Sequence, residues 1–331
     1  MISVCARSSG EHAAALLDHQ VRALIAWHAP VLADRDPEPL HQLRVSMRRL
    51  RVTLTQFAPV LRLPAELRLS RLAKTSRRLG LARDLDVLQE RLQQQLLPHL
   101  PAAELELLRP VLKQLRRERC QAHQQVVEQL KGGSYLSWLA QMQRWLRKPA
   151  FTPLAEQPLA DALVQWQLPW IAELFVHPAW AIDPLVSEAQ REQLHSLRKQ
   201  IKLARYQLDN CKHLLGRSSR RWQRSLKAMQ EQLGELNDLQ VLQRAIADQL
   251  HGSLPADLPA LSALLQRSEA ESWQAWRHLA GRHGGLEPAQ QLLGALRRDR
   301  SRALLRKHSL AMCSALHGLV FCDWRAPLAA R

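Results

Sequence analysis

The chain has 331 residues, of which 47 are Lys or Arg and 30 are Asp or Glu, so its formal net charge is +17. A hydrophobic fraction of 46%, with 12 Gly and 18 Pro, excludes both an intrinsically disordered and a collagen-like chain. Arg accounts for 38 of the basic residues, and its planar guanidinium suits phosphate and carboxylate oxygens. The charge therefore indicates a polyanionic partner: nucleic acid, an acidic lipid surface or a chain of phosphates.

Helical periodicity runs through most of the chain. Apolar residues recur at i, i+3, i+4 and i+7, and Tyr and Phe, which favour strands, total only six. In chain order, breaks rich in Pro, Gly or polar residues lie around 34–39, 59–64, 98–101, 131–133, 149–158, 178–184, 215–219, 251–259 and 281–288. The sequence therefore predicts an all-α protein of roughly eight to ten helices.

No secretion or membrane segment is predicted. The first residues lack the apolar run of a signal peptide. The best membrane candidate, residues 162–182, contains Pro169, Glu173 and Pro178 and would span poorly. The five cysteines form no C-x-x-C pair, which argues against a zinc site or a disulfide framework; they are Cys5, Cys120, Cys211, Cys313 and Cys322. We expect a cytoplasmic protein with no cofactor and no membrane insertion.

Two different motifs each occur twice, at one common offset. Residues 41–51 (HQLRVSMRRLR) and 195–205 (HSLRKQIKLAR) fit H-x-L-R-x-x-x-[RK]-x-x-R and lie 154 residues apart. Residues 79–88 (LGLARDLDVL) and 233–242 (LGELNDLQVL) share L-G-x-x-x-D-L-x-V-L at the same offset. Two independent motifs at one offset predict a duplicated unit, with two related halves that meet near 149–158.

The first motif predicts a helix with a cationic side. At about 100° per residue its basic groups fall within an arc of roughly 80°. We call this set the first basic face: His41, Arg44, Arg48 and Arg51. A separate apolar stripe consists of Leu43, Met47, Leu50, Leu54 and Phe57. The second copy repeats this geometry, with a second basic face of His195, Arg198, Lys202 and Arg205. Its apolar stripe is Leu197, Ile201, Ala204, Leu208 and Cys211.

A basic face can simply be solvated, but solvated faces usually mix both signs of charge. Residues 40–65 contain no acid at all. The same spacing of basic residues also occurs in both copies of the motif, and solubility alone does not require such a repetition. We therefore expect both basic faces to bind an anion.

The two histidines have no second His at i+4 and no carboxylate at ligand spacing, so metal binding is weakly supported. We expect His41 and His195 to donate hydrogen bonds to the same anion. Repulsion by the neighbouring arginines should hold their pKa below the usual value of about 6.5.

The second motif is interpreted as support for the first. Gly80 and Gly234 would allow close helix approach or a break. Asp84 and Asp238 could each orient an arginine of the basic faces through a charge-assisted hydrogen bond. A catalytic carboxylate is the alternative interpretation.

Together these residues resemble the CHAD domain, the conserved histidine α-helical domain. The similar segments are His41–Arg51, Leu79–Val87 and Leu194–Tyr206, and the similarity extends from about residue 11 to 320. The second half departs from the pattern at Asn237 and Gln240, which stand where the first half has Arg83 and Asp86.

The resemblance implies two four-helix bundles related by a pseudo-twofold axis, with a basic central groove or pore. The halves would be residues 1–155 and 156–331 of one domain. It also implies non-catalytic binding of inorganic polyphosphate and association with polyphosphate granules. The residues expected to bind it are His41, Arg44, Arg48, Arg49, Arg51, Lys74, Arg78, Arg83, Arg116, His195, Arg198, Lys199, Lys202, Arg205 and Tyr206.

Two other functions stay open. Nucleic-acid binding fits the charge, although no helix-turn-helix, zinc finger or RNP motif is present. A metal-dependent phosphate-chain hydrolase is the second alternative. Residues 282–284 spell the R-H-G of histidine phosphatases, but that motif follows a β-strand, whereas here it lies in a Gly-rich break between helices. The basic cluster Arg220, Arg221, Arg224 and Lys227 has no matching register at offset 154.

Overall fold

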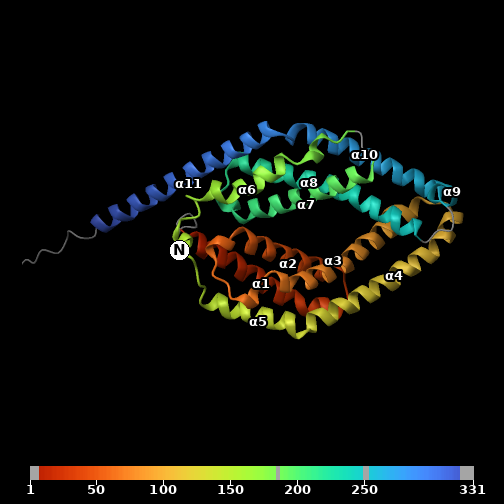
Figure 1. Ribbon diagram of the computed structural model, residues 1–331, viewed down its shortest axis with the longest axis horizontal. Helices are drawn as coiled ribbons and strands as arrows, with labels where there is room; N and C mark the ends of the chain where they lie inside the picture. Colours follow the sequence, from red (N-terminus) through yellow and green to blue (C-terminus); the bar gives the residue numbers. More distant parts are fainter. Residues whose placement is uncertain (1–6, 184–186, 249–252, 321–331) are drawn as a thin grey trace, which may run out of the picture.

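The computed structural model describes residues 7–183, 187–248 and 253–320, with side chains up to residue 305 (Figure 1). Over these residues the protein is all-α, with eleven α-helices and no strands beyond two isolated bridges. The helices are α1 (Ser9–Ala33), α2 (Glu38–Gln56), α3 (Ser70–Arg91), α4 (Ala102–Lys131), α5 (Gly133–Arg147), α6 (Leu163–Phe175), α7 (Glu188–Asn210), α8 (Arg217–Ala247), α9 (Leu254–Asp257), α10 (Pro259–His283) and α11 (Leu286–Val320). The predicted all-α class is confirmed, with eleven α-helices in the described residues where roughly eight to ten were expected.

The helix boundaries follow the predicted breaks. In the described part of the chain ten helices have thirteen or more residues, and the remaining one, α9, has four and lies inside a predicted break. Local capping explains two of the starts. Ser8 and Glu11 form a capping box before α1, and Ser187 and Gln190 form another before α7.

The helices pack in two groups. In one group α1 packs against α2, α3 against α4, and α5 against α1, α3 and α4. In the other, α7 packs against α8, α8 against α10 and α11, and α6 against α7 and α11. Figure 1 shows α1–α5 on one side and α6–α11 on the other. Helices α2 and α7, which carry the two basic faces, contact each other where the groups meet.

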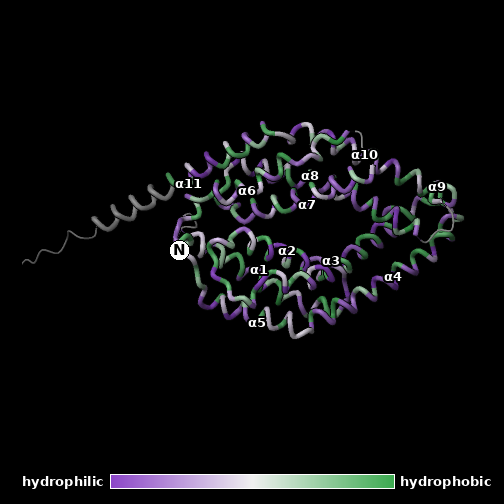
Figure 2. The backbone as a smooth tube through the Cα atoms, viewed as in Figure 1, coloured by the Kyte–Doolittle hydropathy of each residue, from purple (hydrophilic) through white to green (hydrophobic). Residues whose placement is uncertain are grey.

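Apolar stripes form the core. All ten residues of the two predicted stripes are at most 2% exposed, because each stripe faces the helices that pack on α2 or α7. Five tryptophans that lie outside the basic faces are buried as well: Trp138, Trp145, Trp166, Trp170 and Trp276. Figure 2 shows apolar and polar stretches alternating along the helices. Within the described residues, no helix is long and apolar enough to cross a membrane.

Several polar contacts connect the two groups of helices, three of them as follows. The buried Glu104 of α4 accepts hydrogen bonds from the backbone N–H groups of Ala260 (2.7 Å) and Leu261 (2.9 Å), at the start of α10. Arg91 of α3 pairs with Glu235 of α8. The third contact joins the buried residues Gln56 and Asn210 at the ends of α2 and α7.

Two of the five cysteines can be described. Cys120 is an exposed free thiol and Cys211 is a buried one, whose pKa is raised to about 12 by burial. Cys5, Cys322 and the side chain of Cys313 lie outside the described residues. Among the described residues, no three His, Cys, Asp or Glu side chains are arranged to hold a metal ion.

Candidate functional site

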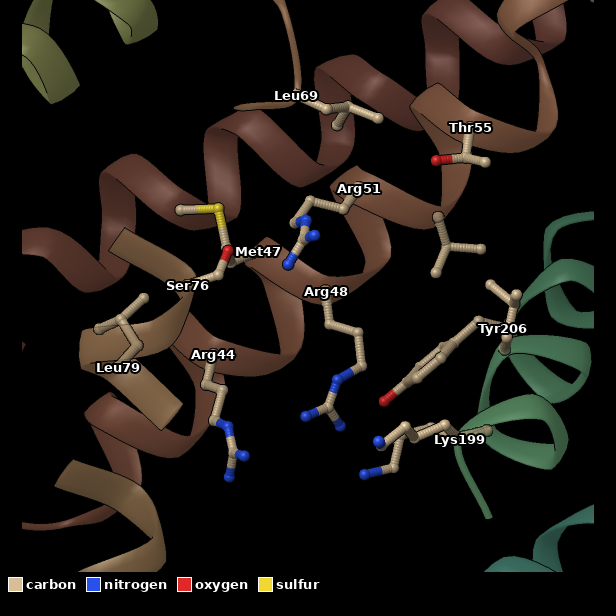
Figure 3. A pocket seen from close by; sticks show the side chains of 13 residues that line it. Arg44, Met47, Arg48, Arg51, Thr55, Leu69, Ser76, Leu79, Lys199 and Tyr206 are labelled. Carbon is tan, nitrogen blue, oxygen red and sulfur yellow. The ribbon is translucent and has the colours of Figure 1, made fainter. Parts of the chain in front are cut away.

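A cavity of about 470 Å³ lies between α2, α3 and α7 (Figure 3). We call it the α2–α7 cavity. Its cationic lining comes from both motif helices: Arg44, Arg48 and Arg51 of α2, and Lys199 and Lys202 of α7. The other lining residues are Met47, Val52, Thr55, Leu69, Ser76, Leu79, Leu203 and Tyr206. The lining therefore contains five cations and no acid.

The position of these cations follows from burial of the apolar stripes. Met47 and Leu50 are buried in the core, so the residues on the adjacent side of α2 are directed toward α7. Ile201 and Ala204 do the same for α7. As a result Arg48 and Lys202, which are 154 residues apart, lie close enough for the charge of Arg48 to lower the pKa of the lysine.

Lys202 is the most perturbed cation of the cavity. Burial, and after it the charges of Arg48, Arg198 and Arg44, lower its pKa to about 7, opposed only in part by Asp238. Burial and the neighbouring Arg44 also lower the pKa of Arg48, although an arginine stays charged at any physiological pH. These shifts show that several positive charges lie close together in the cavity, where no acidic lining residue neutralises them.

Tyr206 lies beside Arg48. The guanidinium of Arg48 and the hydroxyl of Tyr206 point toward each other, and the tyrosine partly offsets the lowering of the Arg48 pKa (Figure 3). Tyr206 is 4% exposed, so its ring is a rigid support. Two more guanidinium carbons lie near the ring, that of Arg205 at 4.7 Å and that of Arg49 at 5.7 Å from its centroid.

The second motif supports the basic faces in both copies. Arg44 Nη1 lies 2.9 Å from Asp84 Oδ1, and Arg198 Nη2 lies 3.7 Å from Asp238 Oδ1. The expected pairing of each aspartate with an arginine of the basic faces is confirmed. A Cβ placed on Gly80 would meet the Arg44 guanidinium at 3.6 Å, and one placed on Gly234 would meet Arg198 at 3.8 Å. Each glycine therefore underlies an arginine side chain, and the neighbour it accommodates is a guanidinium and not a helix backbone.

Neither histidine lines the α2–α7 cavity. His195 borders a smaller cavity beside α8, where its Nδ1 lies 2.6 Å from Asn237 Oδ1. The pKa values of His41 and His195 are both lowered, as expected, but burial is the main cause. Repulsion by Arg83 also lowers the pKa of His41, and repulsion by Lys199 and Arg198 also lowers the pKa of His195.

The remaining expected residues are dispersed. Arg49 Nη2 pairs with Asp209 Oδ2 at 3.3 Å, and Arg205 Nε donates to Gln230 Oε1 at 3.0 Å. Arg83 Nη2 lies 4.0 Å from Glu90 Oε2. Lys74, Arg78 and Arg116 are exposed or half-buried and line none of the cavities in the described part of the chain, so their role stays a prediction.

Sequence analysis missed two parts of the site. Ser76 and Leu203 line the cavity, but nothing in their local pattern distinguishes them from other helical residues. The second omission concerns a face of α8 formed by Arg217, Arg220, Arg224 and Lys227, which lines a separate, larger cavity. The sequence indicated a basic cluster that contains the last three of these residues, but neither Arg217 nor the face as a whole. Its 3-4-3 spacing is the same as that of both basic faces, and this signal could have identified it.

The fold and the site together define a class: an all-α protein in which two similar helices bring arginines and lysines to one cavity. Comparison with protein families is more specific. The family model described as the CHAD domain matches residues 15–247, and the chain belongs to this family.

Solved structures share the fold. The crystal structure of the CHAD domain from the plant Ricinus communis matches with a TM-score of 0.63 and 24% identity, over 84% of this chain and 93% of that one. PptA from Streptomyces chartreusis matches with a TM-score of 0.61 and 21% identity, over 82% of this chain and 99% of that one. No curated protein matches the sequence.

Proposed function

We propose that the chain binds inorganic polyphosphate in the α2–α7 cavity and catalyses no reaction on it. The observation that carries the proposal is a lining of five cations and no acid, with Lys202 half-buried among arginines. Cations in such surroundings are unfavourable unless an anion neutralises them. A chain of phosphates supplies that charge repeatedly and offers several oxygens to each guanidinium.

The chemistry of the lining favours polyphosphate over nucleic acid. Proteins that bind single strands use exposed aromatic rings on which bases stack. Tyr206 is the single aromatic residue of this lining, and its ring is buried and already flanked by Arg49 and Arg205. Polyphosphate has no bases, so it requires only the cations.

A hydrolase receives less support. The Arg282-His283-Gly284 tripeptide ends α10, with no strand before it among the described residues, whereas the phosphatase motif requires one. His283 Nδ1 is 3.0 Å from the Leu279 carbonyl oxygen, and the ring packs edge-on against Trp222. These contacts are typical of a histidine that terminates a helix.

The proposal includes a duplicated architecture. Residues 1–155 and 156–331 would be two related four-helix bundles around a basic groove that contains the α2–α7 cavity. Support comes from paired contacts at the common offset, such as Arg44 with Asp84 and Arg198 with Asp238. Such an arrangement would allow both halves to bind one long polyanion at the same time. We further propose that the protein acts in the cytoplasm on polyphosphate granules.

The test is a titration of wild type and charge-matched variants with polyphosphate. Arg48→Gln with Lys202→Gln removes two charges from the cavity, whereas Arg144→Gln with Arg147→Gln removes two exposed charges from α5. Each lost charge-assisted contact should weaken binding by about 1–3 kcal/mol, so the cavity variant should lose far more affinity than the control. Equal losses in both variants would contradict a defined site.

Competition and turnover complete this test. Wild-type affinity should fall steeply with added salt, because several counterions are displaced. Duplex and single-stranded DNA should compete poorly with polyphosphate at the same concentration of phosphate groups. Steady release of phosphate in the presence of Mg²⁺ or Mn²⁺ would instead indicate a hydrolase.

A further inference from the structure

A second basic cavity of about 1060 Å³ lies along α8, and we call it the α8 cavity. Six cationic side chains line it: Arg205 of α7, Arg217, Arg220, Arg224 and Lys227 of α8, and Arg302 of α11. The four α8 residues extend over about 15 Å of one helix face. This cavity is larger than the α2–α7 cavity and is also predominantly basic.

Acids neutralise only part of this charge. Two acids line the cavity, Asp209 and Asp299. Asp209 pairs with Arg49, which lies outside the lining, and the buried Asp299 lies 3.8 Å from Arg302. Lys227 lies 3.5 Å from Glu231, which does not line the cavity, whereas Arg217 and Arg224 belong to no ion pair among the described residues.

The backbone adds to the attraction for anions. Helix α8 has 31 residues and begins beside Gly216, which supplies no side-chain cap. Gly216, Arg217 and Ser218 all line the α8 cavity, so the N–H groups of the first turn border it, close to the buried carboxylate of Asp299 beside Gly216. The helix dipole is positive at this end and acts in the same direction as the arginines.

The two cavities are neighbours. Tyr206 lines the α2–α7 cavity and the next residue along the chain, Arg205, lines the α8 cavity. The guanidinium carbon of Arg205 is 4.7 Å from the centre of the Tyr206 ring. Arg49 also bridges them, since it approaches the same ring and pairs with Asp209 of the α8 cavity. An anionic chain that leaves the first cavity therefore meets cations on the way to the second.

We propose that the α8 cavity is a second polyphosphate subsite that continues the α2–α7 cavity and makes the protein selective for long chains. The inference rests on the proposed function. A short chain occupies the α2–α7 cavity alone, whereas a long chain bridges to the α8 cavity. The second contact is then intramolecular and increases the affinity without a second binding event from solution.

Titration with tripolyphosphate and with long-chain polyphosphate tests this subsite. Arg217→Gln with Arg224→Gln removes two exposed α8 charges, and Arg297→Gln with Arg298→Gln removes two exposed charges of α11 that line neither cavity. The α8 variant should bind the long chain about tenfold more weakly or worse and bind tripolyphosphate as wild type does. The α11 variant should retain its preference for long chains.

The outcomes separate this inference from the proposed function. Equal weakening of long-chain binding in the α8 and α11 variants would contradict the subsite, because the lower net charge of the protein would then explain the loss. An α8 variant that loses both ligands alike would also overturn it. If Arg48→Gln with Lys202→Gln binds both ligands as wild type does, the proposed function fails, whatever the α8 variant does. If the wild-type protein binds neither ligand, both proposals are wrong.

Discussion

Asn210 donates a 2.7 Å side-chain hydrogen bond to Oε1 of Gln56, and the two residues are 154 positions apart, the same offset that separates the repeated motifs. Under a twofold axis, only residues near the axis contact their own counterparts. Arg48 and Lys202 are a second such pair, since they are separated by the same offset and their charges interact. The proposed axis would therefore pass between α2 and α7, beside the α2–α7 cavity.

The Gln56–Asn210 contact should contribute measurably to stability. Both residues are buried, so Asn210→Leu leaves the Gln56 Oε1 without its partner. We expect a loss of about 1–3 kcal/mol in the free energy of unfolding. A double-mutant cycle with Gln56→Leu, followed by denaturant unfolding, should show a smaller combined loss than the sum of the single losses. Strict additivity would mean that the two side chains are not coupled.

Stability should depend on the charge of Lys202. Its folded-state pKa of about 7 is below the ordinary value of 10.5, so between these two values the unfolded state binds more protons than the folded state. The free energy of unfolding should therefore rise as pH increases from about 7 toward 10. Lys202→Met should flatten this rise, measured as the thermal midpoint from pH 7 to 9. An unchanged pH profile in Lys202→Met would assign the rise to other groups.

Binding should be coupled to protonation of the same lysine. Bound polyphosphate favours the charged form, which Arg44 and Arg48 of α2 and Arg198 of α7 disfavour in the free protein. Affinity should therefore increase as pH falls from about 8 to 7. Lys202→Arg, which stays charged, should flatten this part of the profile in calorimetric titrations.

The histidines should act in a lower pH range. The pKa values of both imidazoles are lowered in the free protein, and a bound anion should raise them, so His41→Gln with His195→Gln should flatten the increase in affinity as pH falls toward 6. An NMR titration of both imidazoles, with and without polyphosphate, measures this directly. If neither pKa rises on addition of the ligand, the histidines do not contact it.

The glycines beneath the arginines should tolerate a methyl group. In the interior of a helix, Gly80→Ala removes backbone freedom, and the nearest atom to the new Cβ is at ordinary contact distance. We expect a gain of about 0.5–1 kcal/mol in stability, and the same for Gly234→Ala. Gly80→Leu should displace the Arg44 guanidinium and reduce polyphosphate affinity. A severe loss of stability in Gly80→Ala would show that close packing matters more than the arginine.

Glu104 should be important for joining the two groups of helices. Its carboxylate accepts two N–H groups at the start of α10 and is 4% exposed, so Glu104→Ala leaves those donors unpartnered. The expected loss is about 1–3 kcal/mol in the free energy of unfolding. Glu104→Gln keeps one acceptor oxygen and should lose less, which thermal unfolding of both variants will compare.

The fold class, the helix breaks and the angular position of each basic group on its own helix could be predicted from the sequence alone. Breaks at 34–39 and 149–158, and the faces containing Arg44 and Arg198, are local properties, because periodicity and Pro or Gly content act within one segment. The pairing of Asp84 with an arginine of the first basic face could also be predicted, because both motifs occur twice at one common offset.

Which cations lie close together depends on how the helices pack against each other. Arg49 and Arg205 belong to the same motifs as Arg48 and Lys202, yet the first two flank Tyr206 on the side of the α8 cavity while the others face each other. Among the motif residues, Lys202 has a pKa of about 7, whereas the pKa values of His41 and His195 are lowered from their usual value. Spacing along a helix defines the direction of a side chain, but its burial and its charged neighbours depend on the helix packed across from it.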